Sequence, residues 1–153
     1  MKPQFHKVPI NLQSSFSIRH DIKSNFGKLW HYHPELELHY IIKGKGVRFI
    51  GDNIANFNSG EIVLLGENLP HTWRCNEEHE LNNDLNVEAI VVHFAADCLG
   101  KDFINLPETY LLPKLFEKAK KGMIIEGKTK TIIAELLLKS TKATDLDKLI
   151  IFL

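Results

Sequence analysis

Between Phe16 and Phe94 the chain is divided into short segments rich in Ile, Val, Phe, Tyr and Leu, separated by Gly, Asn and Asp. Short apolar segments bounded by turn-forming residues are typical of an all-β domain. The clearest predicted strands are 36–43, 47–50, 62–65 and 87–94. The turns at 44–46, 51–53 and 58–60 favour successive hairpins, and the polar, Asn-rich segment 76–86 is predicted to be an exposed loop. We therefore expect a mostly β fold over this part of the chain.

After about Pro107 the apolar residues change to a helical spacing. One helix is predicted from the recurrence of Leu111, Leu112, Leu115, Phe116 and Ala119, with Gly122 as its stop. A second helix is predicted over 129–139, and a third over 145–153 with Asp145 as its N-cap. The boundary between the β part, 1–107, and the helical part, 108–153, lies near this proline.

Composition excludes several classes of protein. The 153 residues suit one domain, and 19 basic residues balance 19 acidic ones, so there is no positive excess to neutralise a nucleic acid backbone. Cys75 and Cys98 stand far apart, outside any CxxC pair, and build neither a disulfide framework nor a zinc ribbon. With no signal peptide and no apolar run long enough to span a membrane, we expect a soluble, cytoplasmic protein.

The chain ends inside the apolar run 149–153, without a capping residue or a polar tail. A natural terminus is usually solvated, so we expect the chain to be a fragment of a longer protein. Five consecutive apolar residues cannot all face one core, and some of them are expected to contact a partner helix or the missing segment.

Four candidate metal ligands stand close together in two stretches of sequence. His31, His33 and Glu37 lie in WHYHPELE, and His71 follows the approach GENLP. Alternation along a strand puts the first three on one face, although Pro34 predicts a break that weakens this parity. Three imidazoles and one carboxylate suit Zn, Ni, Fe or Mn, so we expect a site for one divalent transition metal, with polar pocket lining as the alternative role.

These residues resemble the two cupin motifs. The HxH, the Glu four residues later and Gly44 after six further residues match the first motif, and the spacing from Gly60 to His71 matches the second. The resemblance implies a double-stranded β-helix, or jelly-roll barrel, whose mouth the four ligands line. Three positions depart from the motifs: Gly27 is displaced, Gly66 stands where Pro is usual, and Cys75 stands where Asn is usual.

A longer resemblance is to the N-terminal domain of AraC-type transcriptional regulators. It is carried by the phrases HYHPELELHYIIKGKG, FIGD, GEIVLLGENLPHTWRC and FEKAKKGMIIEGKT. In that family a cupin barrel binds an effector, helices form a homodimer, and a separate helix-turn-helix domain binds DNA. The resemblance implies a sensor barrel at 1–107 and a truncated dimerisation segment at 108–153, with the DNA-binding domain missing. Together with helical periodicity it favours these dimer contacts: Leu136, Leu137, Leu149, Ile150 and Leu153.

Four further residues are candidates for contacting the effector. Strand parity allows His39 and His93 to point into the cavity, although an ordinary structural role is open for both. Arg48 can bind a carboxylate or phosphate and Trp73 can stack on a sugar, with a surface ion pair and core packing as the alternatives.

Three functions remain open from the sequence. The leading hypothesis is a domain that binds a small molecule, such as a sugar, in the barrel and changes how two copies pair, without being an enzyme. The second is a mononuclear metal-dependent cupin enzyme of the dioxygenase or isomerase type, with His39 or His93 as acid or base. The third is a metal sensor, in which the ion itself is the effector.

Overall fold

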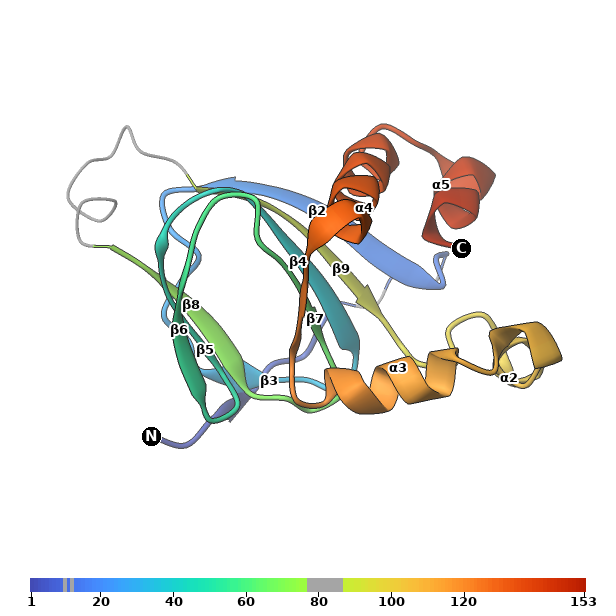
Figure 1. The fold of residues 1–153 in the computed structure, drawn as a ribbon, viewed down its shortest axis with the longest axis horizontal. Helices are drawn as coiled ribbons and strands as arrows, with labels where there is room; N and C mark the ends of the chain where they lie inside the picture. Colours follow the sequence, from blue (N-terminus) through green and yellow to red (C-terminus); the bar gives the residue numbers. More distant parts are fainter. Residues whose placement is uncertain (10, 12, 77–86) are drawn as a thin grey trace.

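The computed structural model describes residues 1–9, 11, 13–76 and 87–153, so most of the loop expected at 76–86 lies outside the described residues. Its described strands form two five-stranded sheets that face each other as a barrel, followed by helices (Figure 1). The first sheet has the order β1-β3-β8-β5-β6 and the second the order β10-β7-β4-β9-β2. The mostly β class, the jelly-roll barrel and the trailing helices expected from the sequence are confirmed.

The strands of the first sheet are β1 (Gln4–Phe5), β3 (His31–Tyr32), β5 (Gly46–Ile50), β6 (Asn53–Phe57) and β8 (His71–Cys75). Those of the second sheet are β2 (Phe16–Lys23), β4 (Leu36–Lys43), β7 (Ile62–Leu65), β9 (Val87–Phe94) and β10 (Met123–Ile125). The helices are α2 (Lys101–Ile104), the 3-10 turn η1 (Pro107–Thr109), α3 (Leu112–Ala119), α4 (Gly127–Ser140) and α5 (Asp145–Phe152). Among these helices, none is long and apolar enough to cross a membrane.

Alternation along the second sheet separates the barrel interior from a face that the helices cover. On β4 the odd-numbered residues from Glu37 to Ile41 point inward, and the side chains between them pack outward. Part of the interior is filled by an apolar core drawn from both sheets: Ile41, Ile50, Phe57, Val63, Leu65, Trp73, Cys75 and Val87. The outer face of β9 packs Ile90 and Val92 against Leu137 of α4.

The helical half differs from the sequence prediction in three places. Residues 123–125 form β10, which pairs with β7 and so returns the chain to the sheet between α3 and α4. A short helix, α2, precedes Pro107. Thr144 occupies the N-cap of α5 in place of Asp145, whose φ of 43° is in the left-handed region. Propensity alone misses β10, because three residues between two helices carry no period of their own.

Gly66 forms a close backbone contact between the end of α3 and the loop that leads to His71. Its N–H donates to the carbonyl of Ala119 at the end of α3, at 2.7 Å. A Cβ atom at this position would lie 2.4 Å from the backbone nitrogen of Lys120, so only glycine allows the approach. This contact accounts for the glycine at a position where the cupin motif usually has proline.

Candidate ligand-binding and metal site

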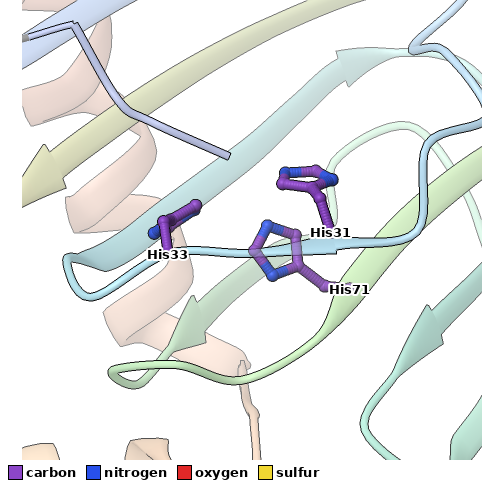
Figure 2. Close-up of side chains that lie close together, drawn as sticks. All are labelled: His31, His33 and His71. Carbon is purple, nitrogen blue, oxygen red and sulfur yellow. The ribbon is translucent and has the colours of Figure 1, made fainter. Parts of the chain in front are cut away.

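The four candidate ligands predicted from the sequence meet at one end of the barrel interior. His31 is on β3, His71 begins β8, and the two residues face each other in the ladder between these strands. His33 directly follows β3 and precedes the expected break at Pro34, and Glu37, beyond that break, is the second residue of β4. Figure 2 shows the rings of His31, His33 and His71 side by side. One ring nitrogen from each of these three histidines lies within 4.8 Å of the others.

His93 of β9 completes this group, which we call the histidine cluster: His31, His33, Glu37, His71 and His93. Glu37 is its centre. Its Oε2 atom accepts hydrogen bonds from Nε2 of His93 at 2.8 Å and from Nε2 of His33 at 3.1 Å, and lies 3.4 Å from Nε2 of His71. The sequence left open whether His93 faces inward or outward, and the structure places it inside.

His39 also points inward and is bonded to the centre of the cluster. Its Nδ1 atom donates to Oε1 of Glu37 at 2.8 Å, and its ring stacks on Trp73 with centroids 4.0 Å apart. Both side chains are buried. His39 therefore holds Oε1 of Glu37, and Trp73, a member of the apolar core, packs against the ring of His39.

Backbone carbonyls orient three of the imidazoles. The carbonyls of Leu29, Glu35 and Leu69 accept from Nδ1 of His31, His33 and His71, at 2.9, 3.1 and 2.7 Å respectively. In a neutral imidazole that donates from Nδ1, the lone pair is on Nε2. In the neutral rings of His31 and His71 this arrangement leaves the Nε2 lone pair available to a metal, as outer hydrogen bonds do in metalloproteins, whereas Nε2 of His33 faces Oε2 of Glu37.

Burial and Glu37 act in opposite directions on the protonation of the cluster. Burial lowers the pKa of His31 to about 4, which leaves this imidazole neutral at pH 7. Burial also disfavours the charged form of His71, but the attraction of the Glu37 carboxylate outweighs it and raises the pKa of His71. For Glu37, burial opposes ionisation, yet His71 and the hydrogen bonds from His33 and His39 hold its pKa well below the usual range.

The donor set fits a divalent transition metal. The Nε2 atom of His71 is buried without a hydrogen-bond partner among the described residues. His33 has acceptors at both nitrogens, the Glu35 carbonyl and the Glu37 carboxylate, which it satisfies together only as a doubly protonated ring. An ion bound at these Nε2 atoms would give Nε2 of His71 a partner. It would also allow His33 to stay neutral, because Nε2 of His33 would then contact the ion and not need a proton. Neutral imidazoles with one carboxylate are the ligands of Zn, Ni, Fe and Mn sites.

Arg48 has its partners inside the fold. Its Nε atom donates to Oε1 of Glu61 at 2.9 Å and its Nη1 atom to Oδ1 of Asn53 at 3.1 Å. The side chain is buried on β5, and neither of these two partners belongs to the histidine cluster. The ion pair considered in the sequence analysis is therefore present, but it is buried on the Arg48 side instead of lying on the surface.

Sequence reasoning missed His6, which extends the group outward. Its ring lies 5.3 Å from the ring of His31, because β1 pairs in parallel with β3. Two-residue strands leave no periodic signal, so the pairing could not be read from the sequence. A small opening of about 220 Å³ lies nearby and is lined by Glu35, His93 and residues of the N-terminal segment.

The five leucines and isoleucines predicted at the dimer contact do not share one surface. Leu137 is only 6% exposed and packs against the barrel, so its assignment to a dimer contact is corrected. Leu136 lines a cavity between the sheet and the helices, and Leu149 is half-buried. Ile150 and Leu153 are exposed.

Comparison with known proteins supports the resemblance. Residues 13–83 match the family model of the AraC-like ligand binding domain. An apo ToxT variant from Vibrio cholerae is 14% identical with a TM-score of 0.52, over 91% of this chain and 52% of that one. ToxT bound to an unsaturated fatty acid is 16% identical, with a TM-score of 0.49 and coverage of 95% and 53%. A cupin 2 conserved barrel domain protein from Rhodopseudomonas palustris is 17% identical, with a TM-score of 0.43 and 57% of each chain covered.

At this level of identity, the likeness to the ToxT variant shows a shared fold. The chain spans about half the length of the ToxT chains that it matches. No curated protein sequence matches it.

Proposed function

We propose that this chain is the effector-sensing part of a transcriptional regulator, because residues 13–83 match the family model of the AraC-like ligand binding domain. We also propose that a divalent metal ion in the histidine cluster anchors the effector. The match is to a ligand-binding domain and not to an enzyme family, which favours sensing over catalysis. The match gives no support to the metal-dependent cupin enzyme that the sequence left open.

One observation carries the metal part of the proposal. The Nδ1 atoms of His31, His33 and His71 are all bound to backbone carbonyls, and a ring nitrogen of each lies within 4.8 Å of the others. A histidine that only packs against its neighbours has no need of such a bond, and here the same ring atom is bonded in all three residues. The ion would be held by these three imidazoles and Glu37, with His93, whose Nε2 faces the same carboxylate oxygen as Nε2 of His33, as a further donor. When bound, it would supply a positive charge that attracts ligand oxygens.

The effector proposed is a small molecule rich in oxygen atoms, of which a sugar is the leading example. The opening beside Glu35 and His93 has about 220 Å³, below the range of drug-sized ligand pockets, which begins near 300 Å³. Hydroxyl groups are suited to exchange hydrogen bonds with imidazole and carboxylate. In the alternative, the ion is itself the effector, and no organic ligand is required.

We further propose that effector binding changes how two copies of the chain pair, and that DNA is bound by residues outside this chain. The signal would pass from β9, which carries His93 on its inner face, to α4 through the contact of Val92 with Leu137 on its outer face. The exposed side of α5, which includes Leu146 and Ile150, is the proposed homodimer contact.

The metal proposal is tested by titrating the chelator-treated protein with Co²⁺ and following visible absorption. We expect one ion per chain. His71→Ala should lower the affinity by more than the ten- to hundredfold typical of losing an outer partner. His20→Ala is the matched control, because His20 pairs with Glu88 on the barrel surface. Equal affinity in the wild type and His71→Ala would contradict the proposal.

The effector proposal is tested with the same preparations in thermal unfolding, using a set of aldopentoses and aldohexoses as probes. A ligand that contacts the ion raises the melting temperature of the metal-loaded protein more than that of the metal-free protein. A shift from the metal alone, with none from any sugar, would favour the metal-sensor alternative. A sugar that shifts both forms equally would exclude the ion as the anchor.

A further inference from the structure

We propose that a second ligand site lies outside the barrel, in the cavity between the second sheet and the helices, and that it takes an uncharged, slender apolar molecule with a single hydroxyl group. The cavity has a volume of about 590 Å³. That volume is within the range of small-molecule sites, and the cavity is open to solvent at lining residues such as Ile124 and Leu153.

The cavity has a sheet as its floor and helices as its walls. Side chains from all five strands of the second sheet contribute to the floor, among them Leu38, Val92 and Phe94. The helices α2 and α3 supply one wall, and α4 and α5 supply the other (Figure 1). Most of the lining side chains are apolar, so an apolar ligand bound there would remove apolar surface from water.

The charge of the lining selects against an ionised ligand. Among the residues that the structure describes, the cavity is lined by one charged side chain, Glu126, and by no Lys, Arg or His. A carboxylate placed there would lose its hydration without gaining a cationic partner, which is costly. Glu126 and Thr129 lie exposed at the edge of the lining, where Thr129 offers a hydroxyl to one polar group of the ligand.

The width of the cavity at one end favours a small molecule over a docked helix. The ring of Phe94 lies 5.9 Å from the ring of Phe116 on α3 and 5.3 Å from that of Phe152 on α5. One aromatic side chain therefore bridges the two walls there. A helix with its side chains is about 10 to 12 Å across, so it does not enter between these walls, whereas an alkyl chain does.

A ligand in this cavity would contact both the second sheet and the helices, whereas a ligand in the barrel site would not contact the helices. A ligand lying on Val92 and Phe94 contacts the outer face of the strand whose inner face carries His93. It also contacts Leu115 of α3 and Leu136 of α4, so it links both helical walls to the sheet.

The test is a titration of the purified chain with the uncharged fluorescent probe N-phenyl-1-naphthylamine. We expect saturable binding of one probe per chain. Leu136→Trp fills the cavity from α4 and should weaken binding at least tenfold, as should Leu115→Trp from α3. Because both leucines are about one-third exposed, the variants should fold, which circular dichroism and melting curves check. Leu138→Trp is the matched control, on the same helix at 44% exposure and outside the lining, and should change the affinity less than twofold.

Displacement of the probe reports the ligand class. 1-Dodecanol should displace it at a concentration at least tenfold lower than dodecanoate, which has the same chain and a charge. Equal weakening by Leu136→Trp and Leu138→Trp, or stronger displacement by dodecanoate, would overturn the proposal. So would probe binding that disappears as the protein self-associates, because a second copy would then be the occupant.

Discussion

Glu37 and His93 face each other across the ladder between β4 and β9, and their side chains meet inside the barrel, with Oε2 and Nε2 2.8 Å apart. The same carboxylate accepts from His33 and His39. Glu37 is 3% exposed, so its charge is stabilised by these donors and not by water. The cluster therefore holds the barrel together as well as offering ligands, and its residues have a structural role even without a metal.

Glu37→Gln should lower the free energy of unfolding of the metal-free protein by about 3 to 5 kcal/mol, the usual cost of breaking a buried charge pair. The measurement is urea unfolding in the presence of a chelator. Glu88→Gln is the matched control, because Glu88 forms a partly exposed pair with His20 elsewhere on β9. Its cost should stay below about 1 kcal/mol. Similar costs for the two variants would show that the buried donors do not stabilise Glu37.

The sequence predicts the strands of the barrel better than the orientations of the side chains inside it. The strands at 36–43, 62–65 and 87–94 were found as predicted, because each has a strong apolar pattern bounded by turn residues. The structure brings His31, His33 and His71 together and places Glu37 against His33 and His71, which is the proximity that the cupin spacing implies. The sequence did not decide the orientations of His39 and His93, since strand parity gives a face but not which face is the interior.

The helical half was less predictable, for a physical reason. Apolar residues at helical spacing indicate that one face of a helix is covered, but not whether the same chain or a second copy covers it. Leu137 was predicted at a dimer contact, yet it packs on β9 of its own chain. The cavity beside it depends on the placement of α3 relative to α5, and β10 between α3 and α4 sets part of that placement. Neither the placement of α3 relative to α5 nor the strand β10 can be predicted from the local sequence pattern.

Gly66→Ala should destabilise the protein by about 1 to 3 kcal/mol, as overpacking against a rigid neighbour does. The added methyl group meets the backbone of Lys120 and Ala119, which cannot rotate away as a side chain would. Thermal unfolding measures the cost. The variant should also weaken Co²⁺ binding, because the loop after Gly66 leads to His71. Unchanged stability would mean that the end of α3 moves freely relative to this loop.

Arg48→Lys should lower the free energy of unfolding by about 1 to 3 kcal/mol, because a single ammonium group cannot make both contacts of the guanidinium. Urea unfolding gives this cost. Its Co²⁺ affinity should stay within twofold of the wild type, since Glu61 and Asn53 are separate from the histidine cluster. An intact fold with a lost response to an effector would instead return Arg48 to the binding site.

Cys98 should react slowly with a disulfide reagent until the pH is well above the pKa of an ordinary thiol. Burial, with a smaller contribution from Asp97, raises the pKa of the Cys98 thiol. A raised pKa leaves less thiolate at any pH below it, and the thiolate is the reactive form. The ratio of folded to unfolded rates should therefore be lowest below about pH 8.5, the ordinary value, and should rise as the pH increases.

Peptide mapping by mass spectrometry separates Cys98 from the buried Cys75. Asp97→Asn should speed the reaction at pH 8 by removing the nearby negative charge, and Asp102→Asn is the control. Because Cys98 lines the cavity proposed above, N-phenyl-1-naphthylamine at saturating concentration should slow the reaction further. A rate that does not depend on pH would contradict the shifted pKa.

The proposed homodimer contact predicts the effect of a charge on α5. Leu146 and Ile150 are 65% and 60% exposed and lie four residues apart, so they are on one face of the helix. In a two-fold contact each side chain occurs twice, so Ile150→Glu introduces two charges into one apolar surface. The dissociation constant of the dimer should rise at least tenfold, measured by sedimentation velocity over a range of concentrations. Leu111→Glu, at a 57% exposed residue before α3, should leave it unchanged. A wild-type chain that stays monomeric at every concentration, or equal effects of the two variants, would exclude this face of α5 as the contact.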